Sequence, residues 1–108
     1  MTDFKCRCGC GRDEMNPYFI SMFNKFQEIL GRPVKITSAF RCKKHNAEVG
    51  GAKDSAHLEG IAVDIFAYSG IEKYDICKIA FLVGFSGVGI GKNFIHLDTK
   101  NSRRVWTY

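Results

Sequence analysis

The chain has 108 residues, which is enough for one hydrophobic core but too few for two domains. Hydrophobic residues make up 45% of it, prolines number two, and no segment has a biased composition, which argues against a disordered protein. The net charge of +5 at pH 7 favours anionic surroundings, but the basic residues are scattered rather than clustered, so we expect no nucleic-acid partner.

No apolar run approaches the roughly 20 residues that a transmembrane helix needs, so we expect no membrane partner. The opening stretch, MTDFKCRCGCGRDE, lacks the apolar segment and the small-residue cleavage site of a signal peptide. We therefore expect a protein that is cytoplasmic as synthesised. We also expect a monomer. Any target outside the cytoplasm would be reached only with help from elsewhere.

Two helices are predicted from apolar residues at helical spacing. The first covers residues 17–30, with Asn16 as its N-cap, and stops at Gly31. The second covers residues 71–83 and stops at Gly84. Each helix has one apolar face, which we expect to lie in the core.

Short runs of β-branched and apolar residues predict strands at 34–39, 61–66, 87–90, 94–98 and 104–107. A short helical segment is expected at 43–49, before a Gly50-Gly51 break. Glycine turns rather than crossover helices separate the last strands, which is typical of antiparallel pairing. The sequence therefore predicts a single α+β domain over residues 1–108, with an antiparallel sheet of about four short strands packed against two main helices.

An aspartate, Asp64, interrupts one apolar strand, and a buried carboxylate needs a cation, hydrogen-bond donors or solvent. Another strand carries His96 and Asp98 two positions apart, so their side chains share a face of the sheet. If these strands pair, His96 meets Asp64, and His57 arrives from the preceding loop. Two imidazoles and one carboxylate form the three-ligand set of catalytic zinc, whereas each histidine taken alone is more simply a core or surface residue.

The cysteines suggest a second feature. Cys6, Cys8 and Cys10 alternate along the chain, which would place their side chains on one side of an extended strand. With Cys42 they could hold a structural zinc, but the spacing lacks the C-x-x-C turn of standard zinc sites, and free thiols or a labile disulfide are the favoured alternatives. Cys77 lies in an apolar helical pattern and is expected to be a small buried hydrophobe.

The motif S-x-H-x-x-G-x-A-x-D runs from Ser55 to Asp64 and is followed downstream by G-I-G and F-I-H-L-D. Upstream, I-T-S-A-F-R-C precedes Asn46 and two adjacent glycines. Together these motifs resemble the M15 family of zinc peptidases, which includes D-alanyl-D-alanine carboxypeptidases and peptidase domains of phage endolysins. The resemblance extends over about residues 4–106, and the cysteine-rich opening is similar to that of small phage and prophage members. This similarity implies release to the cell wall by a phage lysis system.

The resemblance implies one zinc ion held by His57, Asp64 and His96, and substrates drawn from peptidoglycan peptides. It also implies that Arg41 stabilises the developing oxyanion or holds the substrate, and that Ser55 lies near the substrate carboxylate. The simpler interpretations are that Arg41 is a surface cation and that Ser55 is a turn residue. The expected function is a zinc-dependent peptidoglycan peptidase of the D,D-carboxypeptidase or endopeptidase type. The alternative is a zinc-containing wall-binding or phage structural module that has lost catalysis.

The general base is less clearly indicated. Many relatives carry an acidic residue three positions before the last histidine ligand, where this sequence has Asn93, and an amide cannot accept a proton from zinc-bound water. Asp98 is the nearest replacement, as the general base or as a carboxylate that orients a ligand. Glu59 is a weaker candidate.

Overall fold

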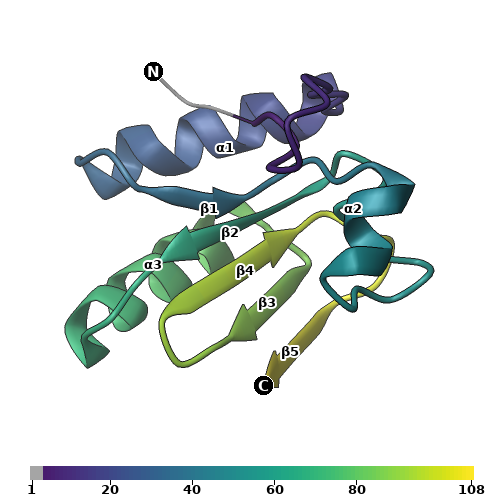
Figure 1. Cartoon of the computed structure of the whole chain (residues 1–108). Coiled ribbons are helices and arrows are strands. Elements are labelled where there is room, and N and C mark those ends of the chain that lie inside the picture. The colour runs from purple at the N-terminus through teal and green to yellow at the C-terminus, as the bar shows by residue number, and fades with distance from the viewer. Residues whose placement is uncertain (1–3) are drawn as a thin grey trace.

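The computed structural model describes residues 4–108, which form helices on a five-stranded sheet (Figure 1). The helices are α1 (Pro17–Leu30), α2 (Lys43–Glu48) and α3 (Gly70–Val83). The strands are β1 (Ile36–Ser38), β2 (Ala62–Phe66), β3 (Gly87–Ile90), β4 (Phe94–Asp98) and β5 (Arg104–Thr107). Every expected element is present with ends shifted by a residue or two, and the α+β class is confirmed.

Both long helices begin at side-chain caps. The side-chain oxygen of Asn16 accepts hydrogen bonds from the backbone N–H groups of Tyr18 (2.8 Å) and Phe19 (3.1 Å). Helix α3 begins with a capping box, in which Ser69 Oγ accepts from the Glu72 N–H and the Glu72 carboxylate accepts from the Ser69 N–H, each at 3.1 Å. Across residues 4–108, no helix is long and apolar enough to cross a membrane.

The sheet has the strand order β1-β2-β4-β3-β5 and is mixed. Three of its neighbouring pairs are antiparallel, but β5 lies beside β3 and runs parallel to it. The loop of residues 99–103 passes the beginning of β3, so β5 is added on the far side of β3 instead of pairing with β4. The prediction of a purely antiparallel sheet of about four strands is therefore wrong at this edge.

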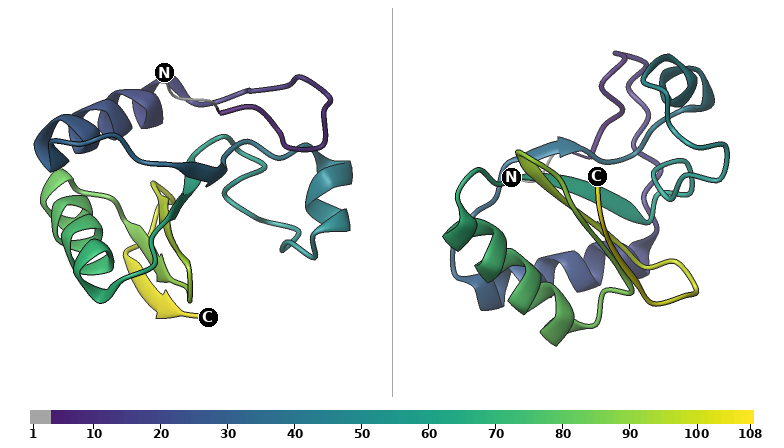
Figure 2. Two further views of the ribbon diagram at one scale, coloured as in Figure 1. Left: turned by 60° about the vertical axis from the view of Figure 1, so that its left-hand side comes forward. Right: turned by 90° about the horizontal axis from the view of Figure 1, so that it is seen from below.

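Helices α1 and α3 cover one face of the sheet, whereas α2 and the loop after it lie on the other side (Figure 2). The core lies between the long helices and the sheet. Its largest buried side chains are Phe19, Phe23, Phe26, Val63, Ile65, Ile76, Phe85, Val88, Ile95 and Leu97. Because side chains alternate along a strand, the residues between these on β2 and β4 point to the opposite face.

The cysteine-rich segment turns back on itself. Residues 7–10 form turns, and Gly9 and Gly11 have φ angles of 89° and 78°. The N–H of Cys6 donates to the carbonyl of Arg12 across this loop at 2.8 Å. The expectation of an extended strand is wrong here, because glycine adopts the left-handed conformation at little steric cost and lets the chain reverse.

Candidate metal centre

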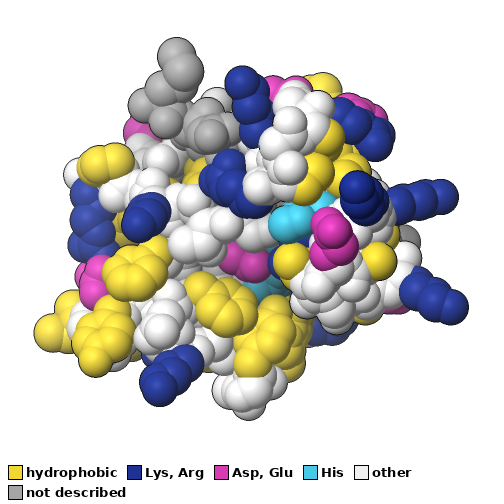
Figure 3. Space-filling view, in the orientation of Figure 1, with side chains coloured by type: hydrophobic (Ala, Val, Ile, Leu, Met, Phe, Trp, Pro, Cys, Tyr) yellow, Lys and Arg dark blue, Asp and Glu magenta, His cyan; other side chains and the backbone are white. Residues whose placement is uncertain are grey.

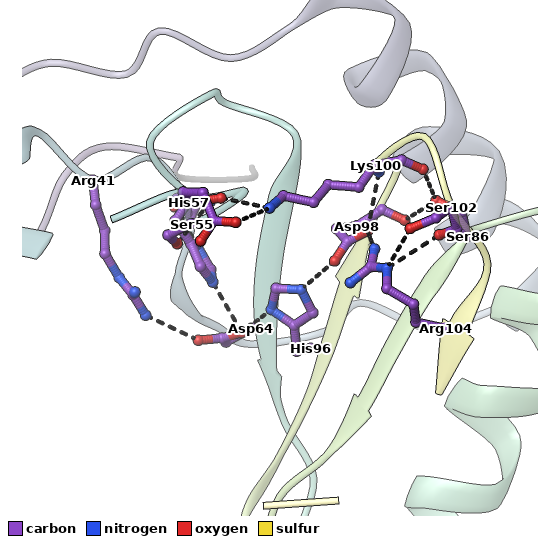
Figure 4. A network of polar contacts seen from close by, with 12 residues as sticks. Arg41, Ser55, His57, Asp64, Ser86, His96, Asp98, Lys100, Ser102 and Arg104 are labelled. Carbon is purple, nitrogen blue, oxygen red and sulfur yellow. Dashed lines mark hydrogen bonds and ion pairs between the residues drawn. The ribbon is translucent and has the colours of Figure 1, made fainter. Parts of the chain in front are cut away.

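The three predicted ligands come from separate elements and meet at one point (Figure 4). Asp64 on β2 and His96 on β4 are direct cross-strand partners, and His57 reaches them from the turn before β2. Asp64 Oδ1 lies 3.2 Å from His57 Nε2 and 3.1 Å from His96 Nδ1. All three residues are at most 9% exposed. The meeting of these side chains follows from the register of the two strands, as the sequence indicates.

Each histidine is oriented by a hydrogen bond from its other ring nitrogen. His57 Nδ1 lies 2.6 Å from the carbonyl oxygen of Ala39, and His96 Nε2 lies 2.7 Å from Asp98 Oδ2. Because both of these oxygens can only accept, the facing nitrogens carry the protons. When an imidazole held this way is neutral, its lone pair faces Asp64. Three acceptors that face one another repel unless a cation lies between them, so the donor chemistry fits a metal ion.

The separations between these atoms also fit a small tetrahedral ion. With zinc–ligand bonds of about 2.0–2.1 Å, two ligand atoms of a tetrahedron lie about 3.3–3.4 Å apart. Asp64 Oδ1 lies 3.2 and 3.1 Å from the inward nitrogens of His57 and His96, close to this edge, and all three ligand atoms lie within 4.8 Å of one another. Two imidazole nitrogens and one carboxylate oxygen leave the fourth position for water, as in catalytic zinc sites.

Electrostatics at the centre favour positive charge between the three side chains. Burial raises the pKa of Asp64, but the hydrogen bonds and charges of His57 and His96 outweigh it and hold that pKa well below its usual range. Burial lowers the pKa of His96, yet its hydrogen bonds to Asp64 and Asp98 raise that pKa by more. Without a metal, a proton on an inward imidazole nitrogen supplies the positive charge beside the ionised Asp64, and a bound metal ion would take the place of that proton.

Asp98 lies behind His96 rather than at the point where the ligands meet. Its Oδ2 accepts from His96, and its Oδ1 accepts from Arg104 Nη2 (2.5 Å) and from the Lys100 N–H (3.0 Å). Burial raises the pKa of Asp98, but these hydrogen bonds outweigh it and lower the pKa. The residue is 1% exposed. The sequence did not single out Arg104, because its contact with Asp98 requires β5 to lie beside β3.

Arg41 contacts the other oxygen of the central carboxylate. Its Nη2 lies 3.5 Å from Asp64 Oδ2. Its Nε donates to Ser38 Oγ (3.2 Å), and its Nη1 donates to Asn46 Oδ1 (3.3 Å). These contacts hold the guanidinium at the edge of the ligand cluster, where it lines the cleft.

The remaining predicted positions divide into two groups. Ser55 lines the cleft, and its Oγ accepts from the His57 N–H at 3.2 Å, so it holds the turn that carries this ligand. Asn93 and Glu59 are exposed and do not line the cleft formed by the described residues. The structure thus brings Ser55 to the centre and leaves Asn93 and Glu59 outside it.

A cleft of about 380 Å³ opens over the ligand cluster. Figure 3 shows histidine and acidic side chains in a hollow of this face, with Lys and Arg side chains around it. One wall is the loop between α2 and β2. The opposite wall is aromatic and basic and consists of Phe94, Lys100, Arg104, Trp106 and Tyr108.

Two glycines of β3 make room for the site. They pair in register with site residues on β4, Gly87 with Asp98 and Gly89 with His96. A Cβ atom at Gly87 would lie 2.3 Å from Asp98 Oδ1, and one at Gly89 would lie 2.7 Å from the ring of Trp106. Sequence reasoning did not assign them this function, although alternate glycines in a strand are a signal of close approach by other groups.

Fold and site together define a single-domain α+β protein with a buried set of metal-ligating side chains in an open cleft, as in a metal-dependent enzyme. A family model described as Peptidase M15 matches residues 1–98. The match covers most of the chain and all three clustered side chains, so the chain belongs to the M15 peptidase family, whose members are metallopeptidases. The family resemblance is confirmed. Among curated proteins, none matches the chain.

Proposed function

We propose that the protein is a zinc-dependent peptidase that hydrolyses peptide bonds of peptidoglycan beside a D-amino acid. The observation that carries the proposal is the meeting of His57, Asp64 and His96, whose ligand atoms lie within 4.8 Å of one another in an open cleft. A bound zinc ion would lower the pKa of its water and polarise the scissile carbonyl. The net charge of +5 would help the protein to dwell on an anionic cell wall.

The protein's own hydrogen bonds prepare the ligands. The Ala39 carbonyl fixes the tautomer of His57, and the Asp98 carboxylate fixes that of His96, so both inward nitrogens are free to bind metal. We assign Asp98 this orienting role because both of its oxygens are already engaged and its side chain is 1% exposed. A group placed in this way contacts a ligand rather than the reacting water.

Substrate binding falls to the two walls of the cleft. The Arg41 guanidinium lies beside Asp64 and is suited to a carbonyl oxygen that gains negative charge, or to a terminal carboxylate. The Ser55 hydroxyl accepts from a backbone N–H, so its own proton is available to a substrate oxygen. Trp106 and Tyr108 offer apolar surface to side chains of a wall peptide.

One observation favours a second candidate, a zinc-containing module that binds wall peptide without cleaving it. Among the described residues, three carboxylates line the cleft: the ligand Asp64, Asp98 and Asp54. Asp98 is engaged by His96, and Asn93 lies outside the cleft, so Asp54 is the remaining candidate for the proton acceptor. The Asp54 side chain is 90% exposed and makes an ion pair with Lys100, so within residues 4–108 no carboxylate is held beside the ligand cluster as a dedicated proton acceptor.

Digestion of defined muropeptides by the zinc-loaded protein, with mass spectrometry of the products, separates the two candidates. We expect release of D-alanine or scission of a cross-bridge. Both His57→Ala and His96→Ala should abolish product formation and zinc binding at the cluster. His45→Ala is the matched control and should remain active, because that histidine lies on α2 outside the cleft lining. Zinc bound at the cluster with no product from any muropeptide would establish the binding module instead.

A further inference from the structure

A second group of potential ligands lies outside the cleft. Cys6, Cys8 and Cys10 from the N-terminal turn and Cys42 before α2 have sulfur atoms that all lie within 4.8 Å of one another. The Cys6–Cys8, Cys6–Cys42 and Cys8–Cys42 separations are 3.5, 3.8 and 3.6 Å. Four thiols from two distant segments therefore converge, and the peptidase cluster uses none of them.

These separations match the edges of a tetrahedral thiolate site. Zinc–sulfur bonds of about 2.3 Å place two sulfurs of a tetrahedron about 3.8 Å apart, whereas a disulfide joins two sulfurs at about 2.0 Å. All four cysteines are free. A disulfide would also use only two of the four thiols, and the convergence of the other two would have no explanation.

The local backbone supports a site for anionic sulfur. The Cys42 N–H donates to Cys6 Sγ at 3.4 Å, and the His45 N–H donates to Cys42 Sγ at 3.5 Å. Such N–H donors partner metal-bound thiolates and orient them. The turn with left-handed Gly9 and Gly11 lets the C-x-C-x-C segment wrap around a point, which the C-x-x-C spacing does in standard zinc sites.

Charge around the cluster is complementary to a tetrathiolate zinc centre, which would carry a net charge of about −2. Basic residues flank the cysteines in sequence: Lys5, Arg7, Arg12, Lys43 and Lys44. Of these, Arg12 pairs with Glu14 and also interacts electrostatically with Cys10 and Cys42. Sulfur ligands select zinc over magnesium or calcium, which prefer oxygen.

We propose that Cys6, Cys8, Cys10 and Cys42 bind a structural zinc ion, separate from the ion in the cleft. Two ligands are buried and two are exposed, so the site is anchored on the protein and open to metal from solvent. The donor set is closed, because four protein sulfurs leave no position for a water or substrate.

This ion would fasten the N-terminal segment to the wall of the cleft. Cys42 directly follows Arg41, whose N–H donates to the carbonyl of His57 at 3.1 Å. The residue before Arg41, Phe40, donates its N–H to the carbonyl of Phe4 at 3.2 Å. The segment that carries Arg41 is thus held by the N-terminal arm, and the cysteine site strengthens this attachment.

Metal analysis of the full chain, purified under reducing conditions and reconstituted with zinc, tests the proposal. We expect about two zinc ions per chain in the wild type, and about one in both Cys8→Ser and Cys10→Ser. Cys77→Ser is the matched control and should keep the wild-type content, since this cysteine lies on α3. His57→Ala should keep the ion bound by sulfur, so failure of the cleft site and failure of the cysteine site give different results.

Cobalt(II) provides a second measurement that does not depend on the folding of a cysteine variant. The wild type and His57→Ala, loaded with cobalt, should both show the intense thiolate-to-cobalt charge-transfer bands of a four-sulfur tetrahedral site. The absence of these bands from the wild type would overturn the proposal. Unchanged zinc content in Cys8→Ser and Cys10→Ser would also overturn it, as would fewer than five titratable thiols in the denatured, unreduced protein.

Discussion

At the scale of single residues, the two imidazoles of the cleft are secured differently. His57 donates to a backbone carbonyl, that of Ala39, which no side-chain substitution removes. His96 instead donates to the Asp98 side chain, which is held in turn by Arg104. The orientation of His96 therefore depends on two further side chains, and this half of the site is the more sensitive to mutation.

The variant Asp98→Asn should show whether Asp98 orients His96 or acts as the general base. An amide can turn its N–H₂ toward His96 and oppose the tautomer that binds metal, so we expect zinc affinity at the cleft to fall by about 10–100-fold. Competition with a calibrated chelator measures this affinity. Asp54→Asn, an exposed position on the same cleft, is the control and should bind zinc as the wild type does. If Asp98 were instead the general base, turnover would fall and zinc affinity would stay unchanged.

At the scale of elements, β3 contributes to the site mainly because two of its residues are glycines without side chains. Its alternate glycines leave space on the face that carries His96 and Asp98, and the carboxylate of Asp98 lies over Gly87. The strand still pairs on both sides, because hydrogen bonding of the backbone needs no side chain.

Gly87→Ala should therefore displace the Asp98 carboxylate. Because this group is short and fixed by three hydrogen bonds, we expect a loss of unfolding free energy of about 1–3 kcal/mol, together with weaker zinc binding in the cleft. Gly70→Ala is the control, since a Cβ atom there meets nothing within 4 Å. Denaturant titration of both variants measures the free energies, and equal values would contradict the close approach.

The capping box of α3 predicts a dependence of stability on pH. The hydrogen bond from the Ser69 N–H lowers the pKa of Glu72 below its ordinary value of 4.5. A carboxylate with a depressed pKa in the folded state contributes stability above its unfolded pKa and loses that contribution as the pH falls through the folded value. Glu72→Gln should therefore lower Tm at neutral pH, and the difference from the wild type should shrink as the pH falls below 4.5.

Thermal unfolding across this pH range checks the prediction. Glu28→Gln on α1 is a suitable control, because this residue is exposed and lies outside the helix cap. A Tm difference between Glu72→Gln and the wild type that stays constant from acid to neutral pH would show that the charge of Glu72 contributes nothing to the cap.

At the scale of the whole molecule, one segment links both candidate metal sites. The carbonyl of Ala39 orients His57, Arg41 contacts Asp64, and Cys42 belongs to the cysteine cluster. The Phe40 N–H donates to the Phe4 carbonyl and the Arg41 N–H donates to the His57 carbonyl, so the two proposed ions would support the same stretch of chain.

Removal of metal should therefore lower the stability of the entire domain. By mass action, a ligand that binds only the folded state raises Tm with its free concentration. We expect zinc added to chelator-treated protein to raise Tm in the wild type, and to raise it by less in His57→Ala and in Cys10→Ser. A Tm that does not respond to zinc in the wild type would contradict both sites.

Local sequence patterns were sufficient to predict the elements and the side of the sheet on which the site lies. Caps such as Asn16 and Ser69 act within one helical turn, and the alternation of a strand places Asp64, His96 and Asp98 on a common face once β2 and β4 pair. These features depend on contacts over a few residues, so the local pattern is sufficient to predict them.

The way in which distant segments combine depends on tertiary packing, which no local pattern predicts. The loop after β4 could have closed a hairpin, but it carries β5 past β3 and brings Arg104 to Asp98. Likewise, the spacing of the N-terminal cysteines argued against a metal site, whereas a turn and the approach of Cys42 gather four thiols. Such contacts depend on packing between parts of the chain that are far apart in sequence, where no short pattern specifies which edge or which thiol will be the neighbour.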